Sequence, residues 1–428
     1  MLSRNLTQCA SRLRRFLSED VLNVVGKRTE FSQRMRKLTP SRAVWTFVTG
    51  VASGTVNTIA DFVRLFEALT GETMSYKPFH DRLSNPTFPD LLRTTLCNLM
   101  SRLTAPILGG KSRVLKHFSD IIVHDGTSFA INHALKDVYP GRYSKISPAA
   151  VEVHCTYSLY KGQAIDFDVA PDAVQERAYL PEADSTEGKL ILFDRGYTCY
   201  EYGSAVKAAA GDFIGRTKDK NFNPTIRKCF RGFSQKKTLE GKRLKDLVLP
   251  KSNVDLLVEG KDRHGKVHQL RLVLFYVARK DAHIYLSTSL SPREFPPSIV
   301  ASLYRLRWQI ELLFKECKSY TKLQKFMTKD RYIVEGLIWA SLLAVLIRRF
   351  LLHSAFQGTG RRVAPFIAAA LSWTFFLSLA KTAVRGFVQL VGTLGSILEH
   401  LRHTAERTNR HRTSTFDLLD ICPIGSWG

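Results

Sequence analysis

The chain has 428 residues, of which 44% are hydrophobic; it is long enough for two or three domains, and its apolar content excludes wholesale disorder. Lysine and arginine number 63 against 38 aspartate and glutamate residues, so the formal net charge is +25. Such an excess favours a polyanionic partner, with nucleic acid as the first candidate and an anionic membrane surface as the second.

The seven cysteines are scattered singly, without a Cys-x-x-Cys pair. This pattern argues against a zinc knuckle or a disulfide framework and favours a reducing compartment such as the cytoplasm. Two late apolar stretches raise the alternative of membrane spans, Gly336–Ile347 and Val363–Ala380. The first is too short to span a bilayer and the second contains a proline and three hydroxyl side chains, so we predict buried helices for both.

Residues 1–110 predict a helical region. Apolar residues recur at helical spacing in three segments, Ala43–Val51, Val56–Leu69 and Phe88–Leu103. Gly71 and Pro78 are the expected breaks. The first 18 residues hold four arginines and no acid, without the apolar core of a signal peptide. They predict a basic helix or arm against DNA, with an organelle presequence as the less favoured alternative.

Residues 111–216 change to strands followed by helices, which predicts the first part of an α/β core. The expected strands are Asp120–Asp125, Val151–Tyr160, Ala164–Val169, Lys189–Asp194 and Phe213–Arg216, with a helix at Glu201–Ala210. Two of these runs end in an acid, at Asp125 and Asp194. Ligands of open α/β sheets bind beyond the carboxyl ends of strands, so both acids can meet in one crevice. Each acid alone has the alternative of an ordinary turn residue.

Residues 217–290 predict a basic, β-rich insertion rather than a separate fold. Between Arg216 and Lys251 there are 12 lysines and arginines against 3 acids. Strand-like runs follow at Val254–Glu259, Lys266–Ala278 and His283–Thr288. Two prolines at 296 and 297 end the insertion.

Residues 291–330 predict a long helix, from about Ser298 to Tyr320, that completes the core. Along a helix that advances about 100° per residue, five of its residues fall within an arc of roughly 80°: Tyr304, Arg307, Glu311, Lys315 and Lys318. A solvated ladder of ion pairs is the alternative. The apolar residues of the same helix give this polar face a defined orientation, which favours a face that looks into the crevice. Residues 331–428 predict a helical C-terminal region with a basic tail from Arg402 to Arg412.

Three carboxylates in one crevice repel one another, and divalent cations remove that repulsion. Mg²⁺ and Mn²⁺ prefer carboxylate and water oxygens, and a pair of ions about 3.5–4 Å apart can hold both oxygens of a phosphoryl displacement. Asp125, Asp194 and Glu311 are therefore candidate metal ligands. The cations beside Glu311 would then hold substrate phosphates.

The helix residues reproduce a known pattern, Tyr304-x2-Arg307-x3-Glu311-x6-Lys318. It resembles the Tyr-Arg-Glu-Lys signature of bacterial cut-and-paste transposases of the insertion-sequence-four family. The segments around the other two acids, Asp125-Gly-Thr127 and Asp194-Arg-Gly-Tyr197, are similar to that family's first and second acid motifs. The order of the acids and the place of the β-rich insertion also agree, and the resemblance is strong over residues 115–325.

The resemblance implies an RNase H-like α/β core with a β-rich insertion, flanked by helical N- and C-terminal regions. The first of these regions would bind DNA, and the second would bring two copies together in a synaptic homodimer. It implies a DNA transposase that cleaves double-stranded transposon ends and joins them to target DNA in a bacterial cytoplasm, associated with the nucleoid. The implied ligands of two Mg²⁺ ions, which Mn²⁺ can replace, are Asp125, Asp194 and Glu311. The implied phosphate contacts are Tyr304, Arg307 and Lys318, with Lys315, Arg195 and Thr127 as further candidates for substrate binding.

The chain departs from some of these relatives in its insertion. They hold a flipped base with a tryptophan there, whereas this insertion contains none. A base-stacking role would fall to His283, Tyr285 or Tyr276. Two other functions stay open at this point: a structure-selective nuclease on the same fold, and a DNA-binding protein that has lost catalysis.

Overall fold

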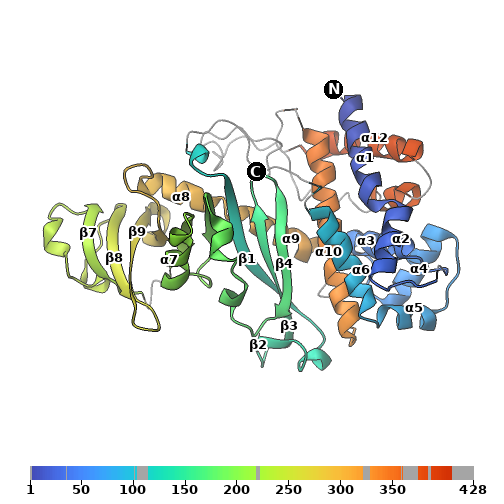
Figure 1. Ribbon diagram of the computed structural model, residues 1–428, viewed down its shortest axis with the longest axis horizontal. Helices are drawn as coiled ribbons and strands as arrows, with labels where there is room; N and C mark the ends of the chain where they lie inside the picture. Colours follow the sequence, from blue (N-terminus) through green and yellow to red (C-terminus); the bar gives the residue numbers. More distant parts are fainter. Residues whose placement is uncertain are drawn as a thin grey trace.

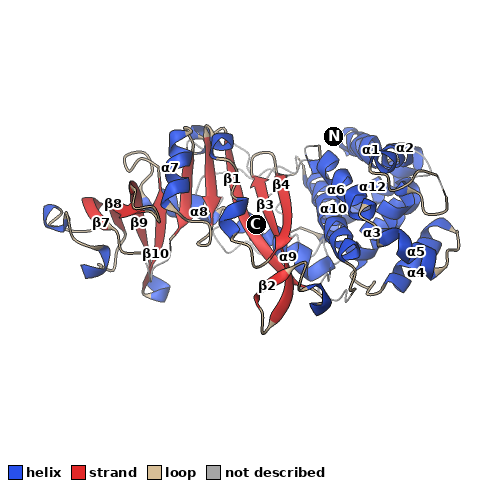
Figure 2. Cartoon of the chain, turned by 60° about the horizontal axis from the view of Figure 1, so that its bottom comes forward, coloured by secondary structure: helices blue, strands red, loops and turns tan. Residues whose placement is uncertain are grey.

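The computed structural model describes residues 2–34, 36–100, 102–103, 114–217, 222–321, 328–357, 359, 375–383 and 387–406. It is a mixed α/β structure in which one large sheet extends away from helices packed at one end of the molecule (Figure 1, Figure 2). Most of Val363–Ala380 and the basic tail beyond residue 406 lie outside the described residues.

The N-terminal region is helical, as predicted, over its described residues. Its helices are α1 (Leu2–Leu17), α2 (Glu19–Arg28), α3 (Pro40–Ser53), α4 (Ile59–Thr70), α5 (Tyr76–Leu83) and α6 (Thr87–Met100). Thr58 and Asp61 form a capping box at the start of α4, and Gly71 ends that helix with a φ of 73°. The predicted break at Pro78 is wrong. Pro78 lies in the first turn of α5, where a missing amide leaves no helical hydrogen bond unmade.

The C-terminal helices pack onto this region. α10 (Arg331–Phe356) contacts α3 and α6, and α12 (Phe387–Thr404) contacts α1 and α10. A Cβ on Gly336 would lie 2.1 Å from the Phe88 ring of α6, so the two helices approach closely there. The stretch Gly336–Ile347 is thus a buried helical segment, as predicted. Among the described residues, no helix is long and apolar enough to cross a membrane.

The central sheet begins with strands β1 (Asp120–Ala130), β2 (Pro140–Tyr143), β3 (Ser147–Ser158), β4 (Gln163–Pro171), β5 (Lys189–Phe193) and β6 (Asp212–Arg216). β4, β3 and β1 are neighbours and antiparallel, whereas β1, β5 and β6 are neighbours and parallel. β2 pairs with the other end of β3. The helix α7 (Tyr200–Ala208) makes the crossover from β5 to β6.

The insertion adds four strands to the same sheet. They are β7 (Thr225–Arg231), β8 (Val254–Lys261), β9 (Val267–Val277) and β10 (Ala282–Thr288). β10 pairs with β6, and the order continues through β9 and β8 to β7. A second hydrophobic cluster fills the insertion, and Tyr285 packs against it. Tyr276 and His283 face each other across β9 and β10 with ring centroids 5.2 Å apart.

The predicted single helix over residues 298–320 is wrong, because the chain forms α8 (Pro297–Arg305) and α9 (Trp308–Thr321) with a turn between them. The amides of Leu306, Arg307, Gln309 and Ile310 each bond to the carbonyl three residues earlier. This tighter hydrogen bonding turns the chain between two helical segments. α9 contacts β1, α3 and α10, so it joins the sheet to the helical region.

The remaining ordered segments are short 3₁₀ turns at Leu115–His117, His133–Leu135, Glu176–Tyr179, Ala183–Thr186, Lys237–Leu239, Leu244–Asp246 and Ala278–Lys280. The third of them, η3 (Glu176–Tyr179), lies in the connection from β4 to β5. The main hydrophobic core runs without interruption from the N-terminal helices to the sheet, so the two are held as one body.

Candidate active site

Asp125 lies within β1 and not at its end, so the prediction of a strand-ending acid is wrong for this residue. Its position is nevertheless special. β1 pairs with β5 only as far as His124 and Phe193, and then continues against β3 alone. Asp125 is the first residue beyond the parallel pairing, and Asp194 follows directly after β5. The register of two parallel strands therefore places these acids beside each other.

Arg307 connects β1 to the third acid. Its guanidinium donates to Asp125 Oδ2 at 2.7 Å and also to Glu311 Oε1. The same guanidinium lies 5.7 Å from the ring centroid of Tyr304, whose hydroxyl donates to Asp194 Oδ1 at 3.2 Å. Five predicted site residues thus meet at one place, because the turn between α8 and α9 presents Tyr304 and Arg307 to the strand ends.

Burial shifts the pKa values of Asp125 and Arg307 and so affects the charge that each carries. The pKa of Asp125 is raised to about 7, mainly by burial; Arg307 and the Gly126 amide oppose the shift, and the charges of Asp194 and Glu311 add to it. Burial lowers the pKa of Arg307, but Tyr304 and the three carboxylates outweigh that effect and raise it above its usual value. Arg307 is therefore a cation that offsets part of a concentrated negative charge.

The donor chemistry fits a hard divalent cation, because all three acids present carboxylate oxygens. A cationic group already lies between Asp125 and Glu311, which shows that the space between them favours positive charge. No group of three His, Cys, Asp or Glu residues in the described chain is close enough to hold a metal ion with the side chains as they stand. A metal ion would have to displace Arg307 from its two ion pairs.

The other residues predicted to contact substrate differ in how deeply they are buried. Thr127 is buried in β1, across from Val153. Lys318 is half-buried with its ammonium 5.5 Å from the ring centroid of Phe129, and burial lowers its pKa. Lys315 is exposed on α9. Arg195 is half-buried and lines a pocket beside Asp194.

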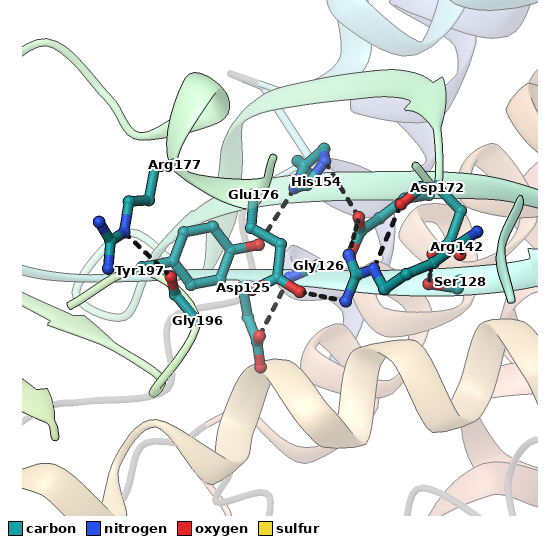
Figure 3. A network of polar contacts seen from close by, with 11 residues as sticks. Asp125, Gly126, Ser128, Arg142, His154, Asp172, Glu176, Arg177, Gly196 and Tyr197 are labelled. Atoms are coloured by element: carbon teal, nitrogen blue, oxygen red, sulfur yellow. Dashed lines mark hydrogen bonds and ion pairs between the residues drawn. The ribbon is translucent and has the colours of Figure 1, made fainter. Parts of the chain in front are cut away.

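A polar cluster behind Asp125 was not predicted (Figure 3). Neighbouring residues of a strand point to opposite faces, so Gly126 faces away from α9. A Cβ on Gly126 would lie 2.7 Å from both Glu152 Oε1 and the Tyr197 hydroxyl, and 3.0 Å from His154 Nδ1. Only glycine fits here without displacing these groups. Burial raises the pKa of Glu152 to about 7 and lowers that of His154 to about 4.

The sequence contains a weak signal for this cluster. Glu152 and His154 alternate with apolar residues in a strand that is buried along almost its whole length. Polar side chains at such positions require partners, and these two find theirs in Arg142 and Tyr197.

Comparison with known proteins gives matches over most of the chain. The family described as Transposase DDE domain matches residues 116–347, a range that contains all three acids. The chain is 22% identical to the transposase for insertion sequence element IS231B of Bacillus thuringiensis subsp. berliner, over 95% of this chain and 94% of that relative. It is 21% identical to the transposase for insertion sequence element IS1151 of Clostridium perfringens, over 73% of this chain and 74% of that relative.

Proposed function

The chain belongs to the transposase DDE domain family, and from that premise we propose that it is a metal-dependent DNA transposase. It binds transposon ends, cleaves phosphodiester bonds and joins the ends to target DNA. The observation that carries the proposal is the convergence of Asp125, Asp194 and Glu311 on Arg307 and Tyr304. A protein that only binds DNA has no need for three carboxylates that face phosphates.

The proposed catalytic core is RNase H-like. The strand order supports this assignment. The neighbours β4, β3 and β1 are antiparallel, and β5 and β6 follow them parallel to β1. Within it, residues 111–216 and 291–330 form the core and residues 217–290 the insertion. Residues 1–110 bind DNA, and residues 331–428 complete the helical region and contribute to a homodimer in the synaptic complex.

Asp125, Asp194 and Glu311 would hold two Mg²⁺ ions, or Mn²⁺ in their place. When bound, such ions stabilise the attacking and leaving oxygens of the displacement. Asp125 must lose its proton before it can act as a ligand, and its raised pKa makes that step sensitive to pH near neutrality. Tyr304 keeps the Asp194 carboxylate oriented through its hydroxyl.

Arg307 and Lys318 bind the phosphates of the cleaved end. The planar guanidinium of Arg307 can give two parallel hydrogen bonds to phosphate oxygens, whereas Lys318 contributes a point charge. As substrate enters, Arg307 would move from Asp125 and Glu311 to the substrate phosphate. The two carboxylates would then need another cation. Substrate phosphate and metal binding are therefore linked through this one side chain.

The insertion supplies sequence-independent affinity for double-stranded DNA. Its basic side chains at Arg231, Lys236, Lys237, Lys242, Arg243 and Lys245 are exposed. They can displace counterions from the DNA backbone. Because the substrate is chromosomal DNA, the proposed location is the bacterial nucleoid.

The test is an assay with purified protein and DNA that carries the element's own inverted repeats. Mg²⁺-dependent cleavage at the repeat ends, followed by joining of pre-cut ends to a target plasmid, is the expected result. Cleavage without joining would indicate a structure-selective nuclease. Binding without cleavage in either metal would indicate a protein that has lost catalysis.

A further inference from the structure

Arg142 of β2 is bound by three acids at the back of the active site (Figure 3). Its guanidinium donates to Glu176 Oε1 at 2.7 Å and to Glu152 Oε2 at 3.2 Å. Its backbone amide donates to Asp172 Oδ2 at 2.9 Å, and Ser128 of β1 donates to the other oxygen of that carboxylate. We refer to Arg142, Glu152, Asp172 and Glu176 as the Arg142 network.

Two carboxylates of this network occupy the space beside two glycines. Glu152 lies 2.7 Å from the place of a Cβ on Gly126, and Glu176 Oε2 lies 1.5 Å from the place of a Cβ on Gly196. Gly126 follows the first catalytic acid directly, and Gly196 comes two residues after the second. The absence of a side chain at both glycines is what lets the acids of the network approach the two catalytic segments.

The turn η3 holds the second segment as well. Arg177 donates to the carbonyl oxygens of Gly196 at 3.4 Å and Thr198 at 2.9 Å. Tyr179 of the same turn stacks on His154 with ring centroids 4.1 Å apart. The turn that carries Glu176 is therefore fixed both to the segment of Asp194 and to β3, the antiparallel partner of β1.

These contacts lie where the sheet itself gives no connection. The parallel pairing of β1 with β5 ends at His124 and Phe193, one residue before each aspartate. Beyond that point the ladder pairs no residue of one segment with a residue of the other. The Arg142 network and the hydrogen bond between Tyr197 and His154 span this gap.

We propose that Arg142 is a positioning residue for the metal site. It holds Glu152 against the segment of Asp125 and Glu176 against the segment of Asp194, and thereby fixes the separation of the two aspartates. The inference rests on the proposed function, since it concerns the shape of the proposed metal site. Without Arg142, Glu152 and Glu176 would lose the group that joins them, and Glu152, which is almost fully buried, would lose the cation that offsets its charge.

The test measures Mn²⁺ affinity by calorimetry in the full-length protein, beside Mn²⁺-dependent cleavage. We expect Arg142→Gln to weaken Mn²⁺ binding by about tenfold or more, which is the usual effect of removing a residue that orients metal ligands. Arg142→Lys keeps the charge but cannot bond both carboxylates in the same geometry, so its affinity should lie between those of wild type and Arg142→Gln. DNA binding without metal should change by less than about twofold in either variant, since no DNA contact is assigned to Arg142.

Arg271→Lys is the matched control, because Arg271 is a buried arginine that binds Asp255 in the insertion, away from the acids. It should lower stability while leaving Mn²⁺ affinity unchanged. Glu176→Ala removes the carboxylate that joins Arg142 to the segment of Asp194, so it should also weaken Mn²⁺ binding. This second variant serves if Arg142→Gln does not fold.

Wild-type Mn²⁺ affinity in Arg142→Gln, or an equal reduction in Arg271→Lys, would overturn the positioning role and leave the proposed function intact. Wild-type Mn²⁺ affinity in Glu176→Ala would also overturn it. Failure of the wild-type protein to bind Mn²⁺ would overturn the metal-dependent function, and this inference with it.

Discussion

Arg307 donates a 2.7 Å hydrogen bond to Asp125, although 182 positions separate them in the chain. The contact exists because the helical segment is broken at Arg307, which turns its side chain toward β1. Arg307, which is largely buried, thus offsets part of the negative charge of the acids. Several properties of the protein should depend on this exchangeable ion pair.

The first prediction concerns the three acids. Asp125→Asn, Asp194→Asn and Glu311→Gln should each reduce Mg²⁺-dependent cleavage by about a thousandfold or more, because each would remove a proposed charged ligand of the ions that stabilise the displacement. Binding of uncleaved DNA should stay within about twofold of wild type, since the exposed cations of the insertion are unchanged. Gel shifts and cleavage assays on the same preparations measure both. A variant that retains substantial cleavage would remove its residue from the site.

The second prediction separates the cations from the acids. Arg307→Ala and Lys318→Ala should weaken binding of a cleaved DNA end by about tenfold, equivalent to about 1.4 kcal/mol, while Mn²⁺ binding is kept. For Arg307 this follows because its removal also takes away a cation that competes with metal. If these residues formed only surface ion pairs, worth about 0.3–0.5 kcal/mol, both variants would bind the cleaved DNA end nearly as well as wild type. Loss of Mn²⁺ binding in Lys318→Ala would contradict the assigned role.

The third prediction uses the pKa of Asp125, which burial raises from 3.8 to about 7. Between these two values the folded protein keeps a proton that the unfolded chain releases, so this group makes the free energy of unfolding fall as pH rises. Asp125→Asn lacks that proton. Measured by denaturant without metal, its stability relative to wild type should therefore increase from pH 4 to pH 7 and level off above pH 7. A difference that is constant with pH would show that the carboxyl titrates normally.

The fourth prediction concerns the salt dependence of DNA binding. Replacing Lys236, Lys237, Lys242, Arg243 and Lys245 with glutamine should flatten the plot of log affinity against log salt, by about 0.9 for each phosphate that no longer pairs with a cation. Lys251→Gln is the control, because Lys251 already forms an ion pair with Asp281 at 2.7 Å. Its slope should match wild type. An unchanged slope in the fivefold variant would mean that this surface faces away from DNA.

The fifth prediction concerns stability. Glu316 of α9 is fully buried and pairs with Arg348 and Arg349 of α10. Glu316→Ala should cost about 3–5 kcal/mol, because it leaves two buried cations without their carboxylate. Arg331 offers a comparison, because its side chain is about half exposed and lies 3.9 Å from the part-buried Glu335, so Arg331→Ala should cost less than about 0.5 kcal/mol. Similar unfolding midpoints for both variants would contradict the structural importance of the buried group.

Much of this structure could be predicted because its signals are local. The strand predicted at Lys189–Asp194 is β5, and Asp194 follows directly after it. A short apolar run that ends in an acid needs few distant contacts to form a buried strand. The basic, β-rich character of residues 217–290 was predicted in the same way, from runs of strand-forming residues and from the excess of lysine and arginine. Its strands extend the central sheet.

The features that the sequence did not predict depend on contacts between residues that are far apart in the chain. The turn at Arg307 has no local signal, because leucine and arginine are both good helix formers. It is accompanied instead by the ion pairs of Arg307 with Asp125 and Glu311. The Arg142 network was missed for a similar reason: its four residues come from β2, β3 and the connection between β4 and β5, and no spacing in the sequence connects them.

The place of β7 at the rim of the sheet has a consequence for handling the protein. The segment that follows β7 covers part of its outer edge, because the Ile226 amide donates to the Lys242 carbonyl and the Gly241 amide donates to the Ile226 carbonyl. Charged side chains on an edge strand are a common further defence against pairing with another molecule. β7 exposes Arg227, Lys228 and Arg231 along a short stretch. Repulsion between copies at this rim would keep them apart at low ionic strength, so variants stripped of charge here should precipitate more readily than wild type in dilute buffer.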